Sequence, residues 1–431
     1  MAKAKKLTAL FLALVMALTL VACSRGKDDD KSNDGQSGGS EDGKTIELTF
    51  YYPTQVGGAL ATGMEEMVAD FNSSHPGIHV TPVYTGSYKN TAQTAMTDIA
   101  GGNAPNVILS GMLDIVDYYN IGAVKDLSSL IAAEGDAWKS DFIDGFWGNF
   151  VYPDGGTYGL PYQHSICVLY YNKDKLAEAG ISKAPYSWDE YLKACQDLQK
   201  KDSKTVSMEF PSDVWVLEAL TLANGDKLCD GTKAVRFDSK AAVDSLGMMQ
   251  KMIQSGGMVQ TYATAAEDFI AESCAMMLNT TGNLGFVINS ATFNWGVALP
   301  PVNTNPGLSY GGGGLIMISG QPAEEEAASW EFMKWMTEPE QSARWMTISG
   351  YFCVRKSCDN LAVVKDYYAA NPQVGEAAAL LQYTTAQWTT DSYWDVYAHM
   401  QTALDSVLLN GADAGTALAQ AQKDATAVLN K

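Results

Sequence analysis

Hydrophobic and polar positions after about residue 45 predict a repeated strand–helix order. Residues 46–51 alternate as in a strand, and residues 59–72 carry apolar side chains at helical spacing until His75-Pro76-Gly77. The pattern then predicts a strand at 78–83, a helix at 88–100 and a strand at 106–109. This order predicts a parallel sheet with helices on both faces. Ligands bind such sheets outside the carboxyl ends of the strands.

A second unit of this kind is expected to begin near Gly159. Ser187-Trp188-Asp189-Glu190 has the spacing of a capping box and predicts a helix that runs to Lys200. From Pro322 onward the pattern is mostly helical. The other expected elements are strands at 166–171, 275–278, 293–299 and 314–318 and helices at 173–179, 214–223, 239–255 and 263–272.

Residues 1–22 have the pattern of a secretory signal peptide, in which three lysines precede the apolar segment Leu7–Leu20. That segment is shorter than the about 20 apolar residues that span a bilayer. It ends at Leu20-Val21-Ala22-Cys23, which resembles the bacterial lipobox, whose cysteine is diacylglycerylated and becomes the new N-terminus. Two or three acyl chains anchor a protein stably. The alternative is an ordinary signal peptide with an incidental Cys23.

Residues 24–44 are rich in Asp, Ser, Gly and Lys and contain no large apolar residue. Such a segment cannot bury enough surface to fold, and as a flexible chain it reaches about 25 Å. We therefore expect residues 23–44 to be a lipidated cysteine and a disordered tether. The tether would hold the folded part at the extracellular face of the cell membrane.

The folded part is long enough for two domains. Its composition and charge disfavour some classes of binding partner. The chain of 431 residues is 46% hydrophobic and has a net charge of −20, which becomes −23 when the three leader lysines are removed. This charge disfavours nucleic acid as a partner, because nucleic acid binding depends on clustered Lys and Arg. No later segment has the about 18 uninterrupted apolar residues of a membrane span.

Six cysteines remain after Cys23, and none forms a CxxC pair, so we expect no zinc site. An exported chain can carry disulfides, and Cys353 and Cys358 could close a small loop. Buried, reduced thiols are an equally open interpretation. His75 and His79 are four residues apart, but the Pro-Gly between them excludes a metal-binding helix face.

Five stretches of the folded part carry a resemblance to one known family. The segment LYYNKDKLAEAG (169–180), followed by SWDEYLKAC (187–195), is highly specific. The five stretches are 84–88, 102–105, 159–173, 311–318 and 348–351, and they span nearly all of the folded part. With these motifs the chain resembles the family 1 extracellular solute-binding proteins of ABC importers. It is most similar to the sn-glycerol-3-phosphate-binding branch and its carbohydrate-binding neighbours.

The resemblance implies a periplasmic-binding-protein-like type II α/β fold, in which two α/β lobes joined by crossover strands close on a ligand. We expect one lobe to comprise residues 45–155 and about 300–355, and the other about 156–299 and 356–431. The resemblance also implies delivery of the ligand to an ABC permease, with no covalent chemistry, and we expect a monomer. A lipid anchor suits a cell without an outer membrane, which would otherwise lose its binding protein.

The resemblance also places ligand contacts on this sequence. Tyr88 matches a ligand-contacting tyrosine after the second strand, and Trp215 falls where an aromatic ring packs on the ligand. Ser165 matches a contacting serine, although His164 departs from the small residue usual before it. Asp114 lies near an acidic hydroxyl acceptor, one or two residues out of alignment.

Three further positions follow from the same resemblance. Thr281 falls where a contacting serine lies, Gly312 where a backbone glycine approaches the ligand, and Tyr351 where a hydroxyl is presented. One departure bears on the ligand. The glycerol-phosphate branch clamps the phosphate with a C-terminal arginine, whereas Gln387-Trp388-Thr389-Thr390-Asp391 has no Arg or Lys. Because a buried phosphate needs a charged partner, we expect a neutral carbohydrate, with glycerol-3-phosphate or a related phosphodiester as the alternative.

A sugar site needs flat aromatic rings for the C–H faces of the sugar and planar polar groups for its hydroxyls. The helical spacing of Trp330, Trp335 and Trp345 instead predicts that these three rings lie in the core. The candidates in loops after predicted strands are Tyr51, Tyr52, Gln55, Tyr88, Asp114, Gln163, Trp215, Asn279, Asn283, Trp388 and Trp394. The glycine run 311–314 lacks the Lys-Ser/Thr of a phosphate loop, so it predicts close backbone approach to a ligand, or a hinge.

Enzymes are the main alternative class. Residues 307–311 match the G-x-S-x-G elbow around Ser309, with His399 downstream, but that elbow needs a strand before the serine and a helix after it. Here a proline-rich segment precedes it and an apolar strand follows. A glycosidase needs two placed carboxylates, and none stands out. A surface adhesin is a third class, but adhesins are usually rich in β-structure. We therefore expect neither enzymatic activity nor a cofactor.

Overall fold

The computed structural model describes residues 45–53, 59–261 and 264–431. The predicted signal peptide, Cys23, the tether and Gln55 lie outside these residues. The strands are β1 Ile46–Pro53, β2 Ile78–Gly86, β3 Val107–Gly111, β4 Leu160–Asn172, β5 Met208–Phe210, β6 Val259–Thr261, β7 Met276–Thr280, β8 Trp295–Ala298, β9 Leu308–Met317 and β10 Thr384–Thr385.

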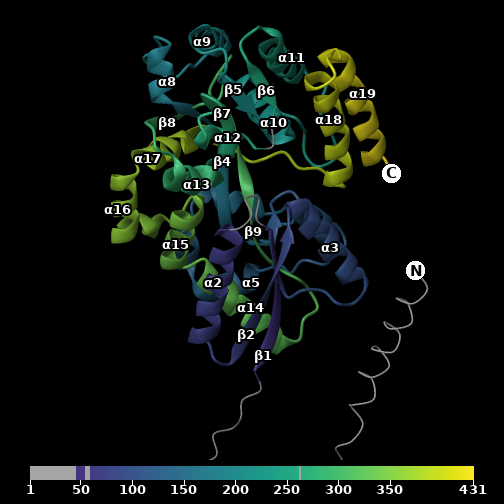
Figure 1. The fold of residues 1–431 in the computed structure, drawn as a ribbon. Coiled ribbons are helices and arrows are strands. Elements are labelled where there is room, and N and C mark those ends of the chain that lie inside the picture. Colours follow the sequence, from purple (N-terminus) through teal and green to yellow (C-terminus); the bar gives the residue numbers. More distant parts are fainter. Residues whose placement is uncertain (1–44, 54–58, 262–263) are drawn as a thin grey trace, which may run out of the picture. The chain divides into compact units, whose positions relative to one another are not determined.

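Helices surround the strands (Figure 1). The α-helices are α2 Ala59–Ser74, α3 Tyr88–Ala100, α4 Ile115–Asn120, α5 Ser128–Glu134, α6 Asp136–Ser140, α7 Asp144–Trp147, α8 Lys173–Glu178, α9 Trp188–Lys201, α10 Val214–Ala223, α11 Lys240–Gln254, α12 Ala265–Ile270, α13 Leu284–Ser290, α14 Ala323–Met336, α15 Pro339–Ser349, α16 Ala362–Ala370, α17 Pro372–Ala378, α18 Tyr393–Leu408 and α19 Ala414–Leu429. The 3-10 helices are η1 Gly148–Phe150, η2 Thr281–Asn283, η3 Lys356–Asn360 and η4 Ala379–Tyr383. Among the described residues, none of these helices is long and apolar enough to cross a membrane.

The first lobe is built on the parallel strands β2, β1 and β3. Successive residues of a strand point to opposite faces of its sheet. The Tyr51 hydroxyl donates to Asp98 of α3 at 2.8 Å, whereas the hydroxyl of Tyr52 donates to Glu65 of α2 at 3.1 Å. The helices α2 and α3 therefore cover opposite faces of β1, as the strand–helix rhythm predicts.

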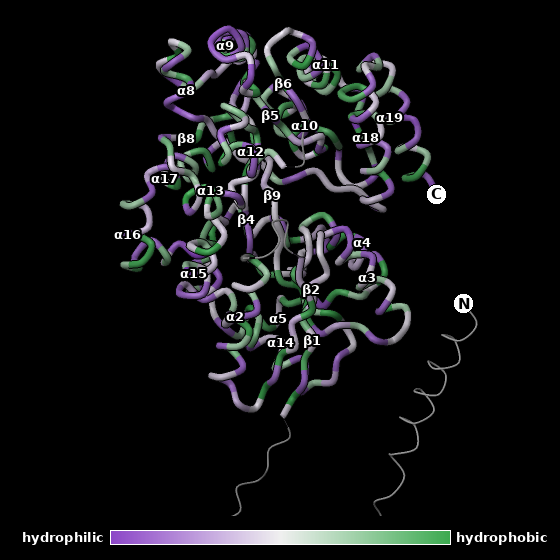
Figure 2. The backbone as a smooth tube through the Cα atoms, in the orientation of Figure 1, coloured by the Kyte–Doolittle hydropathy of each residue, from purple (hydrophilic) through white to green (hydrophobic). Residues whose placement is uncertain are grey.

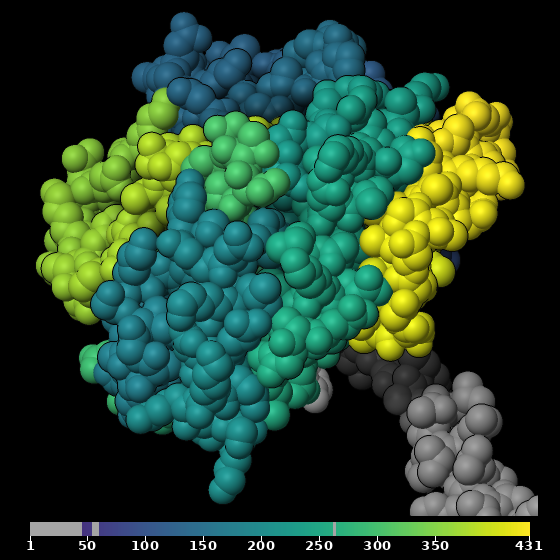
Figure 3. All heavy atoms as spheres, turned by 90° about the horizontal axis from the view of Figure 1, so that it is seen from above, coloured from purple at the N-terminus to yellow at the C-terminus, as the bar shows by residue number. Residues whose placement is uncertain are grey.

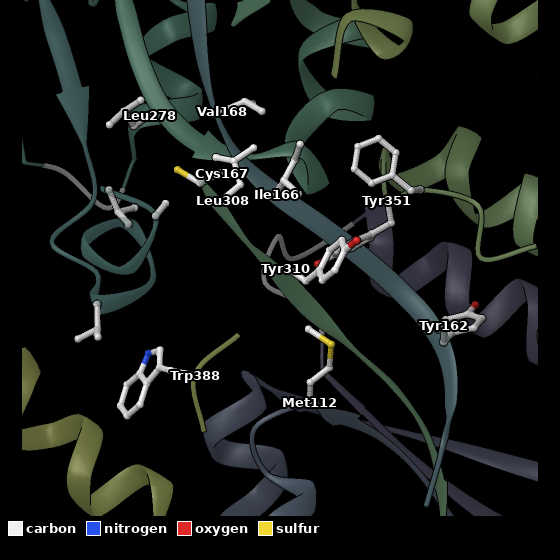
Figure 4. Packing of buried hydrophobic residues seen from close by; sticks show 14 of the residues in the cluster. Met112, Tyr162, Ile166, Cys167, Val168, Leu278, Leu308, Tyr310, Tyr351 and Trp388 are labelled. Carbon is white, nitrogen blue, oxygen red and sulfur yellow. The ribbon is translucent and has the colours of Figure 1, made fainter. Parts of the chain in front are cut away.

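Two long strands, β4 and β9, connect the lobes. Residues 160–166 of β4 pair antiparallel with β9, and residues 167–171 then pair antiparallel with β7. Strand β9 pairs with β4 through residues 310–315 and with β3 through residues 313–317, so it lies between these two strands at residues 313–315. In Figure 4, Ile166, Cys167 and Val168 of β4 lie near Leu308 of β9 and Leu278 of β7. These buried side chains continue the hydrophobic core through the connection between the lobes.

The second lobe repeats the parallel arrangement, because β5 pairs parallel with both β6 and β7. Its helices include α10, which contacts α11, and the C-terminal pair α18 and α19, which pack against each other and against α11. Figure 3 shows this C-terminal pair, in yellow, beside the teal residues of the second lobe. Figure 2 shows hydrophilic residues along the outer helix α9, whose other side buries Trp188 and Tyr191.

The structure confirms the type II fold and many of the element positions predicted from sequence. The Ser187–Glu190 capping box is present at the start of α9. The parallel pairing predicted for the strands between residues 46 and 109 is confirmed in β2, β1 and β3, and the crossover strand β9 pairs antiparallel with β3 and β4. Strand β4 begins at Leu160, six residues before the predicted start, since its polar residues Gln163, His164 and Ser165 are buried in the crossover. The three-residue strands β5 and β6 were not predicted.

The core contains the three tryptophans that the helical spacing assigned to it. Trp330 and Trp345 are buried, and the half-buried Trp335 packs against Phe71 with ring centroids 5.5 Å apart. The six cysteines of the described residues are free thiols, so the Cys353–Cys358 disulfide is not formed. Ser309 lies inside β9 and is fully buried, which differs from the exposed turn of a hydrolase elbow.

Candidate functional site

A cavity of about 380 Å³ lies between the lobes, and we call it the cleft cavity. On the side of the first lobe it is lined by Tyr88, which follows β2, by Gly111 at the end of β3, and by residues 112–114 after that strand. Both segments leave the carboxyl ends of parallel strands, where open α/β sheets bind ligands. The cavity volume is within the range of roughly 300–1,000 Å³ that is common for small-molecule sites.

The second lobe contributes to the cleft cavity in the same way. Asp213 and Trp215 follow β5, Glu267 lies in α12 after β6, and Asn279 and Asn283 lie at the end of β7 and just after it. The carboxyl ends of the parallel strands of both lobes therefore face one cavity. The remaining lining residues from this side are Pro211, Val216, Ala266, Thr280 and Phe286.

The connecting segments form the floor of the cleft cavity, through Ser165 of β4, Gly311 and Gly312 of β9, and Tyr351. Ser165 pairs with Gly311 in the β4–β9 register and is only 3% exposed. Residues from the C-terminal part, Gln387, Tyr393, Trp394 and Tyr397, close the remaining side. A ligand here would contact both lobes and the strands that join them.

Three side chains at this floor form a directed hydrogen-bond chain. The Gln163 amide donates to the Tyr88 hydroxyl, and the Tyr88 hydroxyl in turn donates to that of Tyr351. Burial raises the pKa of Tyr88 well above its ordinary value and that of Tyr351 to about 12, so both phenols carry their protons at neutral pH. Because Tyr351 already accepts from Tyr88, its own proton can be donated to a ligand in the cavity.

Asp114 links the two lobes across the cavity. Its Oδ1 accepts a hydrogen bond of 2.5 Å from Nε1 of Trp394, and the residue is only 2% exposed. Burial raises the pKa of Asp114 to about 8, opposed by the Trp394 hydrogen bond and assisted by the nearby Asp117. This carboxyl group would therefore be largely protonated at neutral pH, and able to donate as well as accept a hydrogen bond.

Trp215 packs closely against Gly311 of the glycine run. A Cβ atom placed on Gly311 would lie 2.7 Å from the indole ring, and the indole Nε1 donates to the backbone oxygen of Tyr310 at 3.3 Å. Asp213 fixes the start of α10 by accepting from the backbone N–H of Trp215 at 2.7 Å. The ring is half-buried, so one part packs on β9 and the rest lines the cavity.

The cavity wall carries acidic side chains but, among the described residues, no cationic one. Asp114, Asp213 and Glu267 line it, and none of its described lining residues is Lys or Arg. The undescribed positions 54–58 and 262–263 also contain neither residue in the sequence. Lys89, an exposed residue of α3, lies 6.0 Å from the ring of Trp394 and is not part of the wall. An anionic group in this cavity would therefore have no cationic partner among the described lining residues.

The family profile described as bacterial extracellular solute-binding protein matches residues 66–376. The chain belongs to this family. It is 25% identical over 338 residues to the sn-glycerol-3-phosphate-binding periplasmic protein UgpB of Escherichia coli K12, covering 73% of this chain and 76% of that protein.

Solved structures show the same fold. UgpB from Mycobacterium tuberculosis in complex with glycerophosphocholine has a TM-score of 0.80 and 22% identity, and covers 90% of this chain and 99% of that one. The ABC substrate-binding protein Lmo0181 from Listeria monocytogenes in complex with cycloalternan has a TM-score of 0.80 and 19% identity, and covers 90% and 100%. These relatives are binding proteins.

In this solute-binding protein, seven of the predicted site residues line the cleft cavity. Each comes from a different strand, helix or loop, and together they come from both lobes, although the sequence separates the first from the last by more than half of the chain. These residues are Tyr88, Asp114, Ser165, Trp215, Asn283, Gly312 and Tyr351. Asn279 and Trp394, from the wider set of candidates, line it too.

Four predicted site residues do not line the cavity. Tyr52 points to α2, as its neighbour Tyr51 points to α3, because strand alternation turns both rings onto the helices. The Gln163 amide donates to the Tyr88 hydroxyl, and Gln163 is not among the residues that line the cavity. The Thr281 hydroxyl accepts from the backbone N–H of Ile166 at 3.1 Å, in the joint between β4 and η2.

Trp388 is the fourth predicted residue that lies outside the cavity wall. Its ring is 4% exposed and packs against Phe237 and Tyr393, and its backbone N–H donates to Glu218 at 2.7 Å. The ring, labelled in Figure 4, belongs to the core of the second lobe. Its neighbour Gln387 lines the cavity in its place.

Several wall residues were missed by sequence reasoning. Asp213 and Glu267 follow β5 and β6, whose three residues each are too few to show a period of two. Recognition of Met208–Phe210 as a strand before the predicted helix at 214–223 would have marked Asp213. Tyr393 and Tyr397 lie on α18, and no local pattern distinguishes the side of that helix that reaches the cavity.

Proposed function

We propose that this protein captures a neutral carbohydrate, an oligosaccharide, outside the cell and delivers it to the transmembrane subunits of an ABC permease. The observation that carries the proposal is a cleft cavity with aromatic rings and hydrogen-bonding groups on its wall and no described cation. Trp215, Phe286 and Trp394 offer ring surface, and Asn279, Asn283 and Tyr351 offer polar groups. This composition suits a guest with apolar C–H faces and a rim of hydroxyls.

Asn283 supports the proposal most directly. Its side chain is 5% exposed, lines the cavity, and has an Oδ1 atom without a partner among the described residues. A buried acceptor without a partner costs roughly 1–3 kcal/mol, which a ligand hydroxyl would recover. Burial raises the pKa of Asp114 to about 8, so the protonated carboxyl group can both donate a hydrogen bond to a ligand hydroxyl and accept one from it.

The alternative is glycerol-3-phosphate or a glycerophosphodiester, and the likeness to the two UgpB proteins favours it. The neighbour Lmo0181, with cycloalternan bound, is equally similar in fold. The cavity wall weighs against the phosphate, since none of its described residues is a cation that could offset the desolvation of the anion. The chemistry of the wall therefore favours the sugar.

Titration calorimetry with a panel of ligands tests the choice. We expect saturable binding of at least one neutral mono- or oligosaccharide and no binding of sn-glycerol-3-phosphate or glycerophosphocholine. The panel should include linear gluco-, malto-, cello- and xylo-oligosaccharides. Binding of a phosphate ester without a response to any saccharide would contradict the proposed function.

We also propose that Cys23 anchors the protein to the membrane through a lipid. The Leu-Val-Ala-Cys motif and the tether composition of residues 24–44 support this. In a host that processes lipoproteins, Cys23→Ser should move the protein from the membrane fraction to the medium, as checked by immunoblot of both. Cys229→Ser, which changes a half-buried thiol of the folded part, is the control and should stay with the membrane. Membrane retention of Cys23→Ser would contradict the anchor.

The lobe boundaries remain part of the proposal. Residues 45–155 with about 300–355, and about 156–299 with 356–431, would move as two bodies about β4 and β9. Packing of α14 against β1 and of α18 against α10 and α11 supports this division. The bond between Trp394 and Asp114 would then form only when the lobes are closed.

A further inference from the structure

A second cavity adjoins the cleft cavity, and we call it the side cavity. It lies between α4 and the loop around Tyr152 on one side and the segment 386–391 on the other. The two cavities share Met112, Leu113 and Gln387 in their walls. The shared residues come from both sides, so the side cavity continues the space between the lobes beyond these three residues.

The side cavity is too small to be a typical ligand site of its own, and its size suits an extension of the cleft cavity. Its volume is about 250 Å³, below the roughly 300–1,000 Å³ usual for a separate small-molecule site. The hydrogen bond of 3.4 Å from Asn120 to Asp391 spans the same two segments. A ligand in the side cavity would therefore be the continuation of a ligand that begins in the cleft cavity.

The side cavity presents an aromatic wall with one available hydroxyl. The ring of Tyr152 lies 4.8 Å from that of Tyr119, and Tyr119 and Tyr158 both donate their hydroxyl protons to Asp154. The Tyr152 hydroxyl donates to none of the described residues, and it lies close enough to Asp117 and Asp114 that they, with burial, raise its pKa. Tyr152 lines the side cavity, which shares three wall residues with the adjoining cleft cavity.

Polar groups accompany this aromatic wall. The Thr389 hydroxyl is buried without a hydrogen-bond partner among the described residues, and Asn149 and Thr232 also line the side cavity. The exposed apolar residue Val151 lies on the same wall. A flat ring with hydroxyl and amide groups around it repeats the chemistry of the cleft cavity on a smaller scale.

We propose that the side cavity is a subsite for the further sugar residues of an oligosaccharide whose first residue occupies the cleft cavity. This inference rests on the proposed function and adds the length of the ligand to it. Sugar residues in the side cavity would pack a C–H face on Tyr152 and form hydrogen bonds with Thr389. Binding should then strengthen with chain length until the side cavity is filled.

Calorimetry over one saccharide series tests the subsite. In the series that binds, the Kd should fall about tenfold or more from the monosaccharide to the di- or trisaccharide. Tyr152→Ala should weaken binding of the longer saccharide far more than that of the monosaccharide. Tyr186→Ala is the matched control, because the Tyr186 side chain is exposed and lies in neither cavity wall. It should leave both affinities unchanged.

A second variant tests the subsite in case Tyr152→Ala does not fold. Ala386 is exposed and lines the side cavity, so Ala386→Trp fills the space without disturbing the core. It should weaken binding of the longer saccharide about tenfold and leave the monosaccharide bound. Equal affinities for the monosaccharide and its longer homologues would overturn the subsite while leaving the proposed function intact. Tighter binding of an octyl or nitrophenyl glycoside than of the disaccharide would also overturn it. If no saccharide binds at all, the proposed function fails as well.

Discussion

Replacement of Gly312 by alanine is expected to leave little folded protein. Gly312 has a φ of +108°, and an added Cβ would lie 2.0 Å from the backbone oxygen of Gln163. That oxygen belongs to β4, the strand that pairs with β9 at the crossover, where the β4–β9 register is already irregular. Neither strand can move without separating the two lobes. We expect a loss of more than about 4 kcal/mol in the free energy of unfolding, measured by urea denaturation.

A matched control separates two effects of the Gly312 substitution: the cost of a positive φ for alanine, and the steric clash of the added Cβ with the Gln163 oxygen. Gly102 also has a positive φ, +76°, but no atom lies within 4 Å of its added Cβ. Gly102→Ala should therefore cost only the left-handed conformation, about 1–2 kcal/mol. If both variants lose the same free energy, the close approach of β9 to β4 does not limit residue 312.

The elements predicted best are those whose pattern is local. The helices α2 and α3 have clear apolar faces, and a Pro-Gly pair or a serine cap marks their limits. The crossover strand β4 was predicted too short because it contains buried polar residues. His164 is fully buried and stacks on Phe146 at 4.2 Å, an environment built by segments remote in sequence. No local pattern distinguishes such a histidine from one in an exposed loop.

The site was predictable where a residue follows a recognisable strand. Tyr88 and Asp114 follow β2 and β3, and both line the cleft cavity. Tyr52 and Trp388 are also aromatic and near strand ends, but their rings turn toward α2 and toward Phe237. Whether such a side chain points into the cavity or into the core depends on the neighbours that pack around it. Those neighbours are remote in sequence, so tertiary packing decides the direction. Contact of any of these residues with a ligand remains a prediction.

Trp215→Ala should weaken binding of the tightest saccharide in the panel by about 30-fold or more, near 2 kcal/mol. The indole Nε1 donates to the backbone oxygen of Tyr310 and the ring packs closely against Gly311, so the ring is ordered before a ligand arrives. A preordered ring gives contact area without a large loss of side-chain entropy on binding. Trp215→Phe keeps a ring but loses the hydrogen bond that orients it. Its saccharide affinity should therefore lie between that of the unchanged protein and that of Trp215→Ala. Calorimetry of the three proteins measures this.

Trp335→Ala is the control that gives the Trp215 result its meaning. Trp335 is also half-buried, but it lies on α14 against Phe71 and not in the wall of the cleft cavity. Its removal should lower the free energy of unfolding by an amount similar to the loss in Trp215→Ala, yet leave the Kd unchanged. Binding and stability would then be separated by position, since the two variants delete the same side chain. Equal Kd values for the two variants would mean that the Trp215 ring supports β9 and does not contact the ligand.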